Sequence, residues 1–508
     1  MIDDDRDRGL AIAIALVATI VYLLTAPAVV NLDGLGYLKL LPHNFAAGHL
    51  LFMPLLRAAT RVLGGDGLKV GRFMNALLGG TGVLFMYGIA RRLAPLRADR
   101  RFVATVAACG LAVSYGYWIQ GADLEAYALA TVALLALVRV ALPYRSRPSL
   151  LRALAIGVVL GAAVLCHLTH VLLSIFVIAI CLEDPRGVKK GALSATLALC
   201  VGGTIALGAY AYAAFLVRGH HIEGALRWVL SAAHGFHESA GAYVLAESIY
   251  GLARSVIWSP YLYESDAPRL LGQFLLGLAP LLGLAVLARR FPHALRDLPL
   301  RPLAALTLPY AALALLFFGA DTERWIFILP ALWFAAAILL DALVHRRLTA
   351  VLVVALIGLC NLRLAILPAH RDGSARHLAE LAAAPLSDGD LLVFPGHTWD
   401  EYVSFYGGKK LEPFPIAYYA ARDGAALMWS RLDRESAAAR ARGHHVYAVR
   451  LFDEHREVAD EPAGYVELRG IGLSRAALRA QLERRFAVVA MELKEGVSLV
   501  RLDPVATP

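Results

Sequence analysis

The sequence has few cysteines and few charged residues for its length. Five cysteines occur in 508 residues, all in or beside apolar runs, and none follows Pro368. They lack the spacing of a disulfide framework or a zinc site, so they do not indicate the redox compartment. Charged residues make up 18% of the chain and hydrophobic residues 59%, whereas soluble proteins average about 25% and about 45–50%. These values exclude a soluble globular protein and predict an integral membrane protein.

Nucleotide-binding and hydrolase motifs are absent as well. The sequence has no glycine-rich phosphate loop, no Walker sequence and no serine nucleophile elbow, so an ATP-driven pump is not expected. The net charge of +9 does not indicate nucleic-acid binding. The basic residues cluster in short loops between apolar runs, where membrane topology explains them.

Membrane-length apolar runs fill the chain up to Pro368. A helix needs about 20 apolar residues to cross about 30 Å of hydrocarbon, and this length gives about eleven candidate transmembrane helices. They lie near residues 10–30, 71–90, 102–118, 124–142, 151–166, 168–182, 192–216, 270–288, 302–319, 325–343 and 348–367. The first run follows acidic residues and lacks a small-residue cleavage site, so it is predicted to be a span rather than a signal peptide.

Basic residues predict the orientation. Arg and Lys cluster in short loops at 91–101, 145–152, 186–190, 289–301 and 346–347. The alternation of spans places all of them on one side, which is cytoplasmic by the positive-inside rule. We therefore predict a multi-pass protein of the cytoplasmic (inner) membrane with a cytoplasmic N-terminus. With an odd number of spans, the segment after Pro368 is periplasmic or, more generally, extracytoplasmic.

Two domains are predicted. Residues 1–367 form a polytopic α-helical transmembrane domain with long outer loops at 31–70 and 217–269, and residues 368–508 form a soluble α/β domain. Within the first loop, residues 43–64 have apolar side chains at helical spacing, which predicts a helix on the membrane surface. After Pro368, strand patterns such as "DLLVFPG" and "HHVYAVRL" alternate with amphipathic patterns such as "LMWSRLDRESAAARARG".

Ionisable residues gather on the predicted outer side. They are Asp33, Asp123, Glu125, His167, His170, Asp321, Glu323 and Arg324. Each has a structural explanation when taken alone: Asp33 as a helix cap, the histidines as partners for backbone groups at a helix break, and Arg324 as a snorkelling side chain. Together they predict a functional site, because ionisable groups at membrane depth are costly. Sugar transfer from a lipid phosphate would use such groups: a carboxylate base for the acceptor hydroxyl and cations for the phosphate.

Several segments resemble one enzyme family. "NLDGLGYL", "GHLLFMPLLRA", "GRFMNALLGGTGVLFMYGIARRL", "WIQGADLEAYAL", "GAAVLCHLTHVLL" and "ERWIFILPALW" occur in the order and rough spacing of the C-type (GT-C) integral membrane glycosyltransferases. That family uses polyprenyl- or dolichyl-phosphate sugars. The sequence is most similar to the protein O-mannosyltransferase-like bacterial membrane proteins. The resemblance covers roughly residues 10–367, and nothing specific is recognised after them.

The resemblance implies roles for individual residues. An acidic residue in the first outer loop is the family's catalytic base or organises its acceptor, and Asp33 occupies that place. Glu125 matches the second acidic site better than Asp123 because Tyr127 follows it at the family's spacing, and Arg324 matches the residue that contacts the donor phosphate. Gly34 departs from the mannosyltransferase pattern, which has two adjacent acids, and this departure speaks against a base role split across such a pair and against a metal site there.

The complete site prediction has three parts. The catalytic residues are Asp33 and Glu125; the donor-phosphate residues are Arg324, His167, His170 and Lys39; and the substrate-binding residues are Tyr37, His49, Asp123, Tyr127 and Glu323. No cofactor is predicted, and a divalent metal ion is left open. The expected partners are a polyprenyl-phosphate sugar donor, membrane lipid and an acceptor protein, lipid or glycan, but not nucleic acid.

The predicted function is an inverting hexosyl or pentosyl transfer from the lipid-linked donor to an acceptor hydroxyl, in protein glycosylation or the cell envelope. One alternative is a transporter or flippase of a lipid-linked sugar. The other is a glycan ligase that uses a diphosphate lipid donor. The chain shows no internal repeat, which disfavours a transporter. A ligase is expected to have an arginine-rich outer loop, and 217–269 contains four arginines.

Overall fold

A computed structural model describes most of the chain as two compact units. The described residues are 5–41, 45–230, 244–259, 267–296, 298, 300–316, 319, 321–395, 399–449, 451, 475–491 and 499–505. Parts of the predicted outer loop 217–269, at 231–243 and 260–266, lie outside them. The first unit comprises the described residues of Met1–Pro27, Gly36–Tyr261 and Asp266–Pro368, and the second those of Ala28–Leu35 and Ala369–Pro508.

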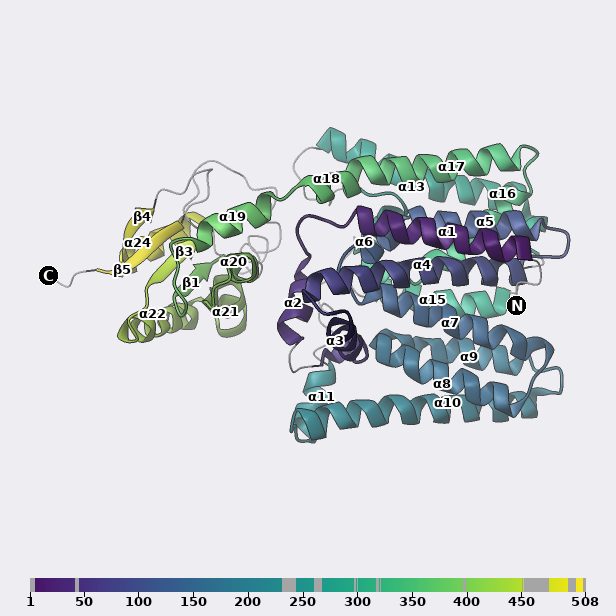
Figure 1. Ribbon diagram of the computed structural model, residues 1–508, viewed down its shortest axis with the longest axis horizontal. Helices are drawn as coiled ribbons and strands as arrows, with labels where there is room; N and C mark the ends of the chain where they lie inside the picture. Colours follow the sequence, from purple (N-terminus) through teal and green to yellow (C-terminus); the bar gives the residue numbers. More distant parts are fainter. Residues whose placement is uncertain are drawn as a thin grey trace. The chain divides into compact units, whose positions relative to one another are not determined.

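The first unit is helical (Figure 1). Its α-helices are α1 (Asp5–Leu24), α2 (Leu32–Leu40), α3 (Phe52–Leu63), α4 (Gly67–Leu93), α5 (Arg100–Val113), α6 (Tyr115–Ala122), α7 (Tyr127–Ser146), α8 (Leu150–Cys166), α9 (Leu173–Leu182), α10 (Val188–Ala211), α11 (Ile222–Leu230), α12 (Val244–Val256), α13 (Ala267–Arg290), α14 (Pro292–Leu295), α15 (Leu300–Leu316), α16 (Leu329–Asp341) and α17 (Arg346–Asn361). Short 3-10 helices η1 (Ala47–His49), η2 (Leu168–Leu172) and η5 (Thr322–Arg324) lie between them. Single π-helical turns η3 (Tyr212–Val217) and η6 (Leu362–Ile366) extend α10 and α17.

The long apolar helices support a multi-pass membrane protein. Among the described residues, five helices are long and apolar enough to cross a membrane, or six if the bent pair α5–α6 is one span. Shorter apolar helices occur at Leu150–Cys166, Leu168–Leu182, Leu300–Leu316 and Leu329–Asp341. By length and composition, this count is smaller than eleven, and the number of spans stays a prediction.

The run predicted as one span at 102–118 is two helices, α5 and α6, which meet at an angle of 64°. The break is at Ser114, which is fully buried. Its hydroxyl donates to Gly110 O (2.9 Å) and accepts a hydrogen bond from Trp333 Nε1 (2.7 Å). A Cβ on Gly110 would lie 2.1 Å from the Trp333 ring. Glycine at 110 therefore allows α16 to approach the bend and stabilise it.

Ion pairs join the basic loops at one end of the bundle. Asp7 of α1 pairs with Arg91 at the end of α4 and with Arg101 of α5. Arg346 of α17 pairs with Asp99 (3.2 Å) and Asp341 (2.6 Å). Helices far apart in the sequence are thus fixed to one another where the chain turns, and the partial neutralisation lowers the repulsion among clustered arginines.

The second unit contains a mixed five-stranded sheet. Its strands are β1 (Leu391–Phe394), β2 (Glu412–Pro415), β3 (Val446–Val449), β4 (Phe486–Met491) and β5 (Leu499–Pro504), in the order β2-β1-β3-β5-β4. Strands β2, β1 and β3 are parallel, and β5 is antiparallel to β3 and β4. Its helices are α19 (Ser374–Ala383), α20 (Trp399–Gly407), α21 (Ile416–Asp423), α22 (Ala425–Ala441) and α24 (Arg475–Arg485), and α18 (Leu367–Arg371) precedes them.

Helices cover both faces of this sheet. Successive residues of β1 point to opposite faces of the sheet. Val393 packs in one hydrophobic cluster with Met428 of α22, and Phe394 packs in another with Ala379 of α19. Every residue of β1 is buried, as expected for a parallel strand covered on both faces. Strand β2 is not in the sequence prediction, because two of its four residues are prolines; it lies at the sheet edge, where proline is tolerated.

Helix α2 begins beside the boundary between the units. Asn31 Oδ1 accepts the backbone N–H of Gly34 (2.6 Å), which is the contact of a helix N-cap. Asp33 is therefore not the cap but lies in the first turn of α2. We describe α2 with the first unit because the ring of Tyr37, a buried residue of its second half, packs 4.9 Å from the ring of Phe52.

Candidate active site

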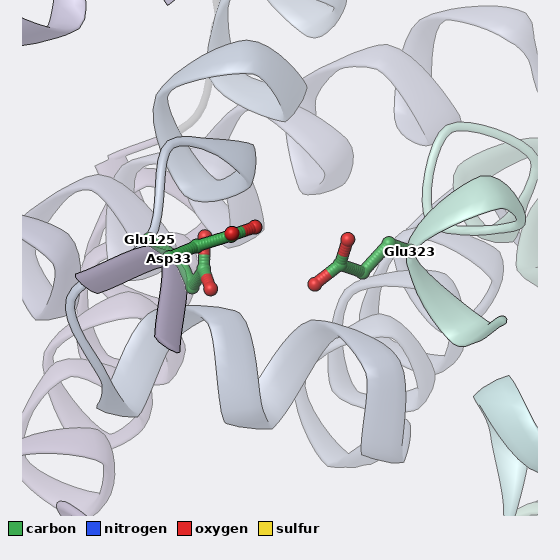
Figure 2. Close-up of side chains that lie close together, drawn as sticks. All are labelled: Asp33, Glu125 and Glu323. Atoms are coloured by element: carbon green, nitrogen blue, oxygen red, sulfur yellow. The ribbon is translucent and has the colours of Figure 1, made fainter. Parts of the chain in front are cut away.

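Three carboxylates from distant parts of the sequence lie together. Asp33 is on α2, Glu125 lies between α6 and α7, and Glu323 is on η5. One oxygen from each lies within 4.8 Å of the other two. Figure 2 shows Glu323 approaching Asp33 and Glu125 from the opposite side. Asp33 is exposed, Glu323 is half-buried and Glu125 is buried, so the cluster joins an accessible carboxylate to a buried one.

The position of Glu125 depends on α4. Asn75, which is fully buried, uses Nδ2 to donate to the backbone oxygens of Asp123 (2.8 Å) and Glu125 (2.6 Å). One turn earlier, Arg72 Nε donates to Asp123 Oδ1 (3.0 Å). These contacts fix the backbone between α6 and α7 and therefore the position from which the Glu125 side chain extends.

The clustered charges repel one another. Two unit charges about 4.8 Å apart repel by roughly 3–4 kcal/mol at an effective dielectric constant of about 20, and by less where water reaches Asp33. Carboxylates this close favour a bound cation or a shared proton. A set of carboxylate oxygens is also the donor set that hard divalent cations such as Mg²⁺ and Mn²⁺ prefer.

A guanidinium group lies next to this cluster. Asp321 accepts the backbone N–H of Glu323 (3.1 Å) and so shapes the short helix η5 that carries Glu323 and Arg324. Arg324 Nη1 donates to the hydroxyl of Tyr127 (3.4 Å). Its Nε lies 3.7 Å from Asp321 Oδ2, and 27% of its side chain is exposed. The Arg324 guanidinium therefore lies beside both the carboxylate cluster and Asp321.

A ring cluster, formed by Tyr37, His49, Tyr127, His167 and Phe327, adjoins Arg324. The His167 ring is at its centre, with centroid distances of 4.6 Å to His49, 5.1 Å to Tyr127 and 5.2 Å to Phe327. Tyr37 joins through His49 at 6.0 Å. The cluster is formed by residues of α2, η1, α7, the α8–η2 break and the segment before α16.

The two histidines at its centre favour the neutral state. His167 Nδ1 accepts the backbone N–H of Thr169 (3.2 Å), so the neutral ring carries its proton on Nε2. That atom is buried and has no hydrogen-bond partner among the described residues. Burial lowers the pKa of His167, and nearby His49 adds to this effect. Burial also lowers the pKa of His49 to about 4, and Arg324 contributes in the same direction.

Three predicted site residues have other surroundings. Both ring nitrogens of His170 are engaged, Nε2 donating to Ala130 O (2.9 Å) and Nδ1 accepting from the hydroxyl of Tyr310 (2.6 Å), so neither is available to a donor phosphate. Asp123 is 2% exposed, binds Arg72 and is not one of the three clustered acids. Lys39 is exposed six residues after Asp33, which is about 240° around α2.

Sequence reasoning missed residues that support the site. Arg72 and Asn75 are polar residues three apart within the apolar run at 71–90, a signal that could have identified them. Phe327 lies three residues after Arg324, on the same side of a helical turn, and "ERWIFILP" contains both.

The fold is similar to that of two membrane proteins of known structure. ArnT from Cupriavidus metallidurans bound to undecaprenyl phosphate is 16% identical, with 98% of each chain covered and a TM-score of 0.54. The archaeal oligosaccharyltransferase AglB from Archaeoglobus fulgidus, in complex with an inhibitory peptide and a dolichol-phosphate, is 13% identical, with 99% of this chain and 75% of that chain covered and a TM-score of 0.55.

A third structure, the Archaeoglobus fulgidus oligosaccharyltransferase in complex with zinc and sulfate, is 14% identical, with 97% of this chain and 73% of that chain covered and a TM-score of 0.52. No protein-family model and no curated protein sequence matches the chain. The structural similarity confirms the C-type glycosyltransferase fold that the sequence resemblance implied.

Proposed function

We propose that the protein transfers a sugar from a polyprenyl-phosphate-linked donor to an acceptor hydroxyl on the outer face of the membrane. The observation that carries this proposal is the meeting of Asp33, Glu125 and Glu323 beside Arg324 in a protein with this fold. The site combines acidic groups for an acceptor and a cation for a phosphate. The bound undecaprenyl phosphate of ArnT and dolichol-phosphate of AglB support this class of donor.

Asp33 is the general base in this proposal. As the acceptor oxygen attacks the anomeric carbon, its proton passes to the Asp33 carboxylate. The new bond to the acceptor oxygen forms while the bond from the anomeric carbon to the phosphate oxygen breaks, and the lipid phosphate leaves with the electron pair from the opposite face. The anomeric configuration is therefore inverted. Asp33 suits this role because it is the exposed member of the carboxylate cluster.

Arg324 and His167 bind the donor phosphate in this proposal. Arg324 supplies the positive charge that stabilises the leaving phosphate. His167 supplies a neutral donor, because its buried Nε2–H has no hydrogen-bond partner among the described residues. Together they supply a cation and an N–H donor to the phosphodiester of the bound donor and to the phosphate monoester that leaves.

The three carboxylates fit a divalent cation. Each offers an oxygen, and the three oxygens are close enough to bind one ion. The zinc bound to the related oligosaccharyltransferase supports a metal in proteins of this fold. A bound cation would hold one oxygen of each acid, offset their mutual repulsion and polarise a nearby oxygen, and the second Asp33 oxygen would still accept the acceptor proton. Asn75 and Asn31 fix the backbone of two of the ligand-bearing segments.

A transfer assay tests the function. The purified protein, reconstituted in liposomes, is incubated with a radiolabelled polyprenyl-phosphate sugar and with acceptor pools of membrane protein, lipid and glycan. We expect label to leave the polyprenyl phosphate and enter one acceptor pool. Movement of intact donor across the bilayer without its consumption would instead identify a flippase, and consumption of only a diphosphate-linked donor would identify a ligase.

Asp33→Asn tests the base in the same assay. We expect a fall in turnover of about 10²–10⁴-fold, the usual contribution of general-base catalysis. Asp66→Asn is the matched control, since Asp66 is another exposed acid of the first outer loop, where it caps α4 by accepting the backbone N–H of Leu68 (3.0 Å). Full turnover by a folded Asp33→Asn protein would exclude Asp33 as the base.

A further inference from the structure

A long apolar groove runs along α1, α5 and α17. Its cavity volume is about 1120 Å³, which is slightly above the range of about 300–1,000 Å³ that is usual for ligand pockets. Small side chains hollow it, among them Ala18, Ala112, Ala355 and Gly358. The groove is therefore built into these helices by residues with little side-chain volume.

The charged residues of the groove lie at one end. They are Asp99, Arg101 and Arg347, which belong to the first turns of α5 and α17 or immediately precede them. The Asp99 carboxylate is already engaged, because it accepts the N–H of Phe102 (3.0 Å) and a hydrogen bond from Arg346 (3.2 Å). Arg347 is exposed, and 53% of the Arg101 side chain is exposed although it pairs with Asp7. The mouth of the groove is thus positive.

This mouth is remote from the carboxylate cluster. The mouth and the cluster are separated by residues 101–113 of α5, which span roughly 18 Å at about 1.5 Å per residue. Helix α6 follows α5 and lies between it and Glu125 in the chain, so it adds to this separation. The same length exceeds half of the roughly 30 Å hydrocarbon core, so an acyl chain of one leaflet fits along the groove. A phosphate at Arg101 and Arg347 therefore cannot be the phosphate of a donor that reacts beside Arg324.

We propose that this groove binds an anionic two-chain phospholipid, with its phosphate between Arg101 and Arg347 and its acyl chains along α1, α5 and α17. Charge complementarity favours an anionic over a zwitterionic headgroup, because a zwitterionic lipid places a cation beside the same two arginines. The bound lipid fills the space between α1 and α17 and stabilises their packing. This site is separate from the sugar-transfer site, so its test does not depend on the proposed function.

Native mass spectrometry of the full-length protein tests the headgroup preference. The protein in detergent is titrated with phosphatidylglycerol and with phosphatidylcholine of identical chains. We expect one tightly retained phosphatidylglycerol and a preference over phosphatidylcholine that falls roughly five-fold in Arg347→Gln, the ratio for a contribution of about 1 kcal/mol per basic residue. Arg100→Gln is the control, since Arg100 is an exposed arginine at the start of α5, next to Arg101, that does not line the groove.

A second pair of variants tests the apolar part. Ala355→Trp fills the groove from α17 without changing its charge, whereas Leu352→Trp places the same ring at an exposed position of α17 that does not line it. We expect Ala355→Trp alone to lose the retained lipid, with both proteins eluting as single species. Equal retention of both lipids by the unaltered protein, or equal behaviour of Arg347→Gln and Arg100→Gln, would overturn the proposal.

Discussion

Asn75 Nδ2 lies 2.6 Å from the backbone oxygen of Glu125, and this contact connects a transmembrane helix to the candidate active site. The same nitrogen also donates to Asp123 O. A single buried amide thus satisfies two carbonyls in the segment between α6 and α7, where no regular helix provides partners. The position of the Glu125 carboxylate is determined from within the bundle.

Asn75→Ala should lower both stability and activity. It leaves buried carbonyls unpaired, at a cost of about 1–3 kcal/mol, and frees the backbone that carries Glu125. Asn361→Ala is the matched control: Asn361 is also fully buried and donates to Val113 O and Val256 O at 2.8 Å each, but it is not part of the site. We expect similar losses of thermal stability and a larger loss of transfer in Asn75→Ala. Equal losses of transfer would make Asn75 merely structural.

Arg324→Ala should weaken donor binding. The change removes the positive charge beside the carboxylates and the contact with Tyr127, so the affinity for polyprenyl phosphate should fall by at least about ten-fold, since hydrogen bonds to charged groups contribute about 1.5–3 kcal/mol. Binding of a fluorescent polyprenyl phosphate measures this. Arg61→Ala, at an exposed arginine of α3, should bind normally. Normal donor binding by Arg324→Ala would remove this residue from the phosphate site.

Sequence patterns could identify unusual residues of the site but could not predict which of them have internal hydrogen-bond partners. Glu125, Arg324 and Asp33 stand out because ionisable groups are rare among apolar runs. The roles of His170 and Asp123 could not be predicted. His170 is hydrogen-bonded to Tyr310 and Asp123 to Arg72, and only the packing of the helices brings these partners together. A sequence reports which groups are unusual in a membrane, whereas packing decides which of them find internal partners.

The fold shows the same division. Apolar runs long enough to span a membrane mark α1, α4, α7 and α10, because their length and composition carry the signal. The bend between α5 and α6 does not stand out, since it depends on Trp333 contacting Ser114 from a helix more than 200 residues later. Strand β2 has prolines that local propensity assigns to loops, although pairing with β1 makes it a strand.

Divalent metal should bind the carboxylate cluster. Titration with Mn²⁺, followed by electron paramagnetic resonance, should show one bound ion per chain that is lost when Glu125→Gln and Glu323→Gln are combined, because two of three ligands become neutral. Asp99→Asn combined with Asp341→Asn is a control that removes two acids elsewhere in the same unit. Binding that survives the first pair and responds to the second would place the ion at the ion-paired end of the bundle.

The free energy of unfolding should decrease as the pH is lowered from about 6.5 towards 4, because the folded protein keeps His49 neutral in this range. Burial lowers the pKa of His49 to about 4, whereas an unfolded histidine titrates near about 6.5. Above about pH 6.5 the ring is neutral in both states and the folded state has no penalty. As the pH falls from about 6.5 towards 4, the unfolded state takes up a proton that the folded state excludes, so the free energy of unfolding decreases.

His49→Gln should therefore reduce the loss of thermal stability between pH 7.5 and pH 5, measured as the change in the unfolding temperature of the detergent-solubilised protein. The substitution keeps a polar side chain near Cys166 O and removes the titrating ring. His345→Gln, at an exposed histidine before α17, should leave the dependence unchanged. His167 is also held neutral by burial, and burial lowers the pKa of His170 to about 4. Part of the dependence should therefore remain in His49→Gln, become smaller when His167→Gln is added, and persist to the extent that His170 contributes. An unchanged slope in this double variant would mean that neither imidazole excludes a proton in the folded protein, and that the ring cluster is more hydrated than its packing indicates.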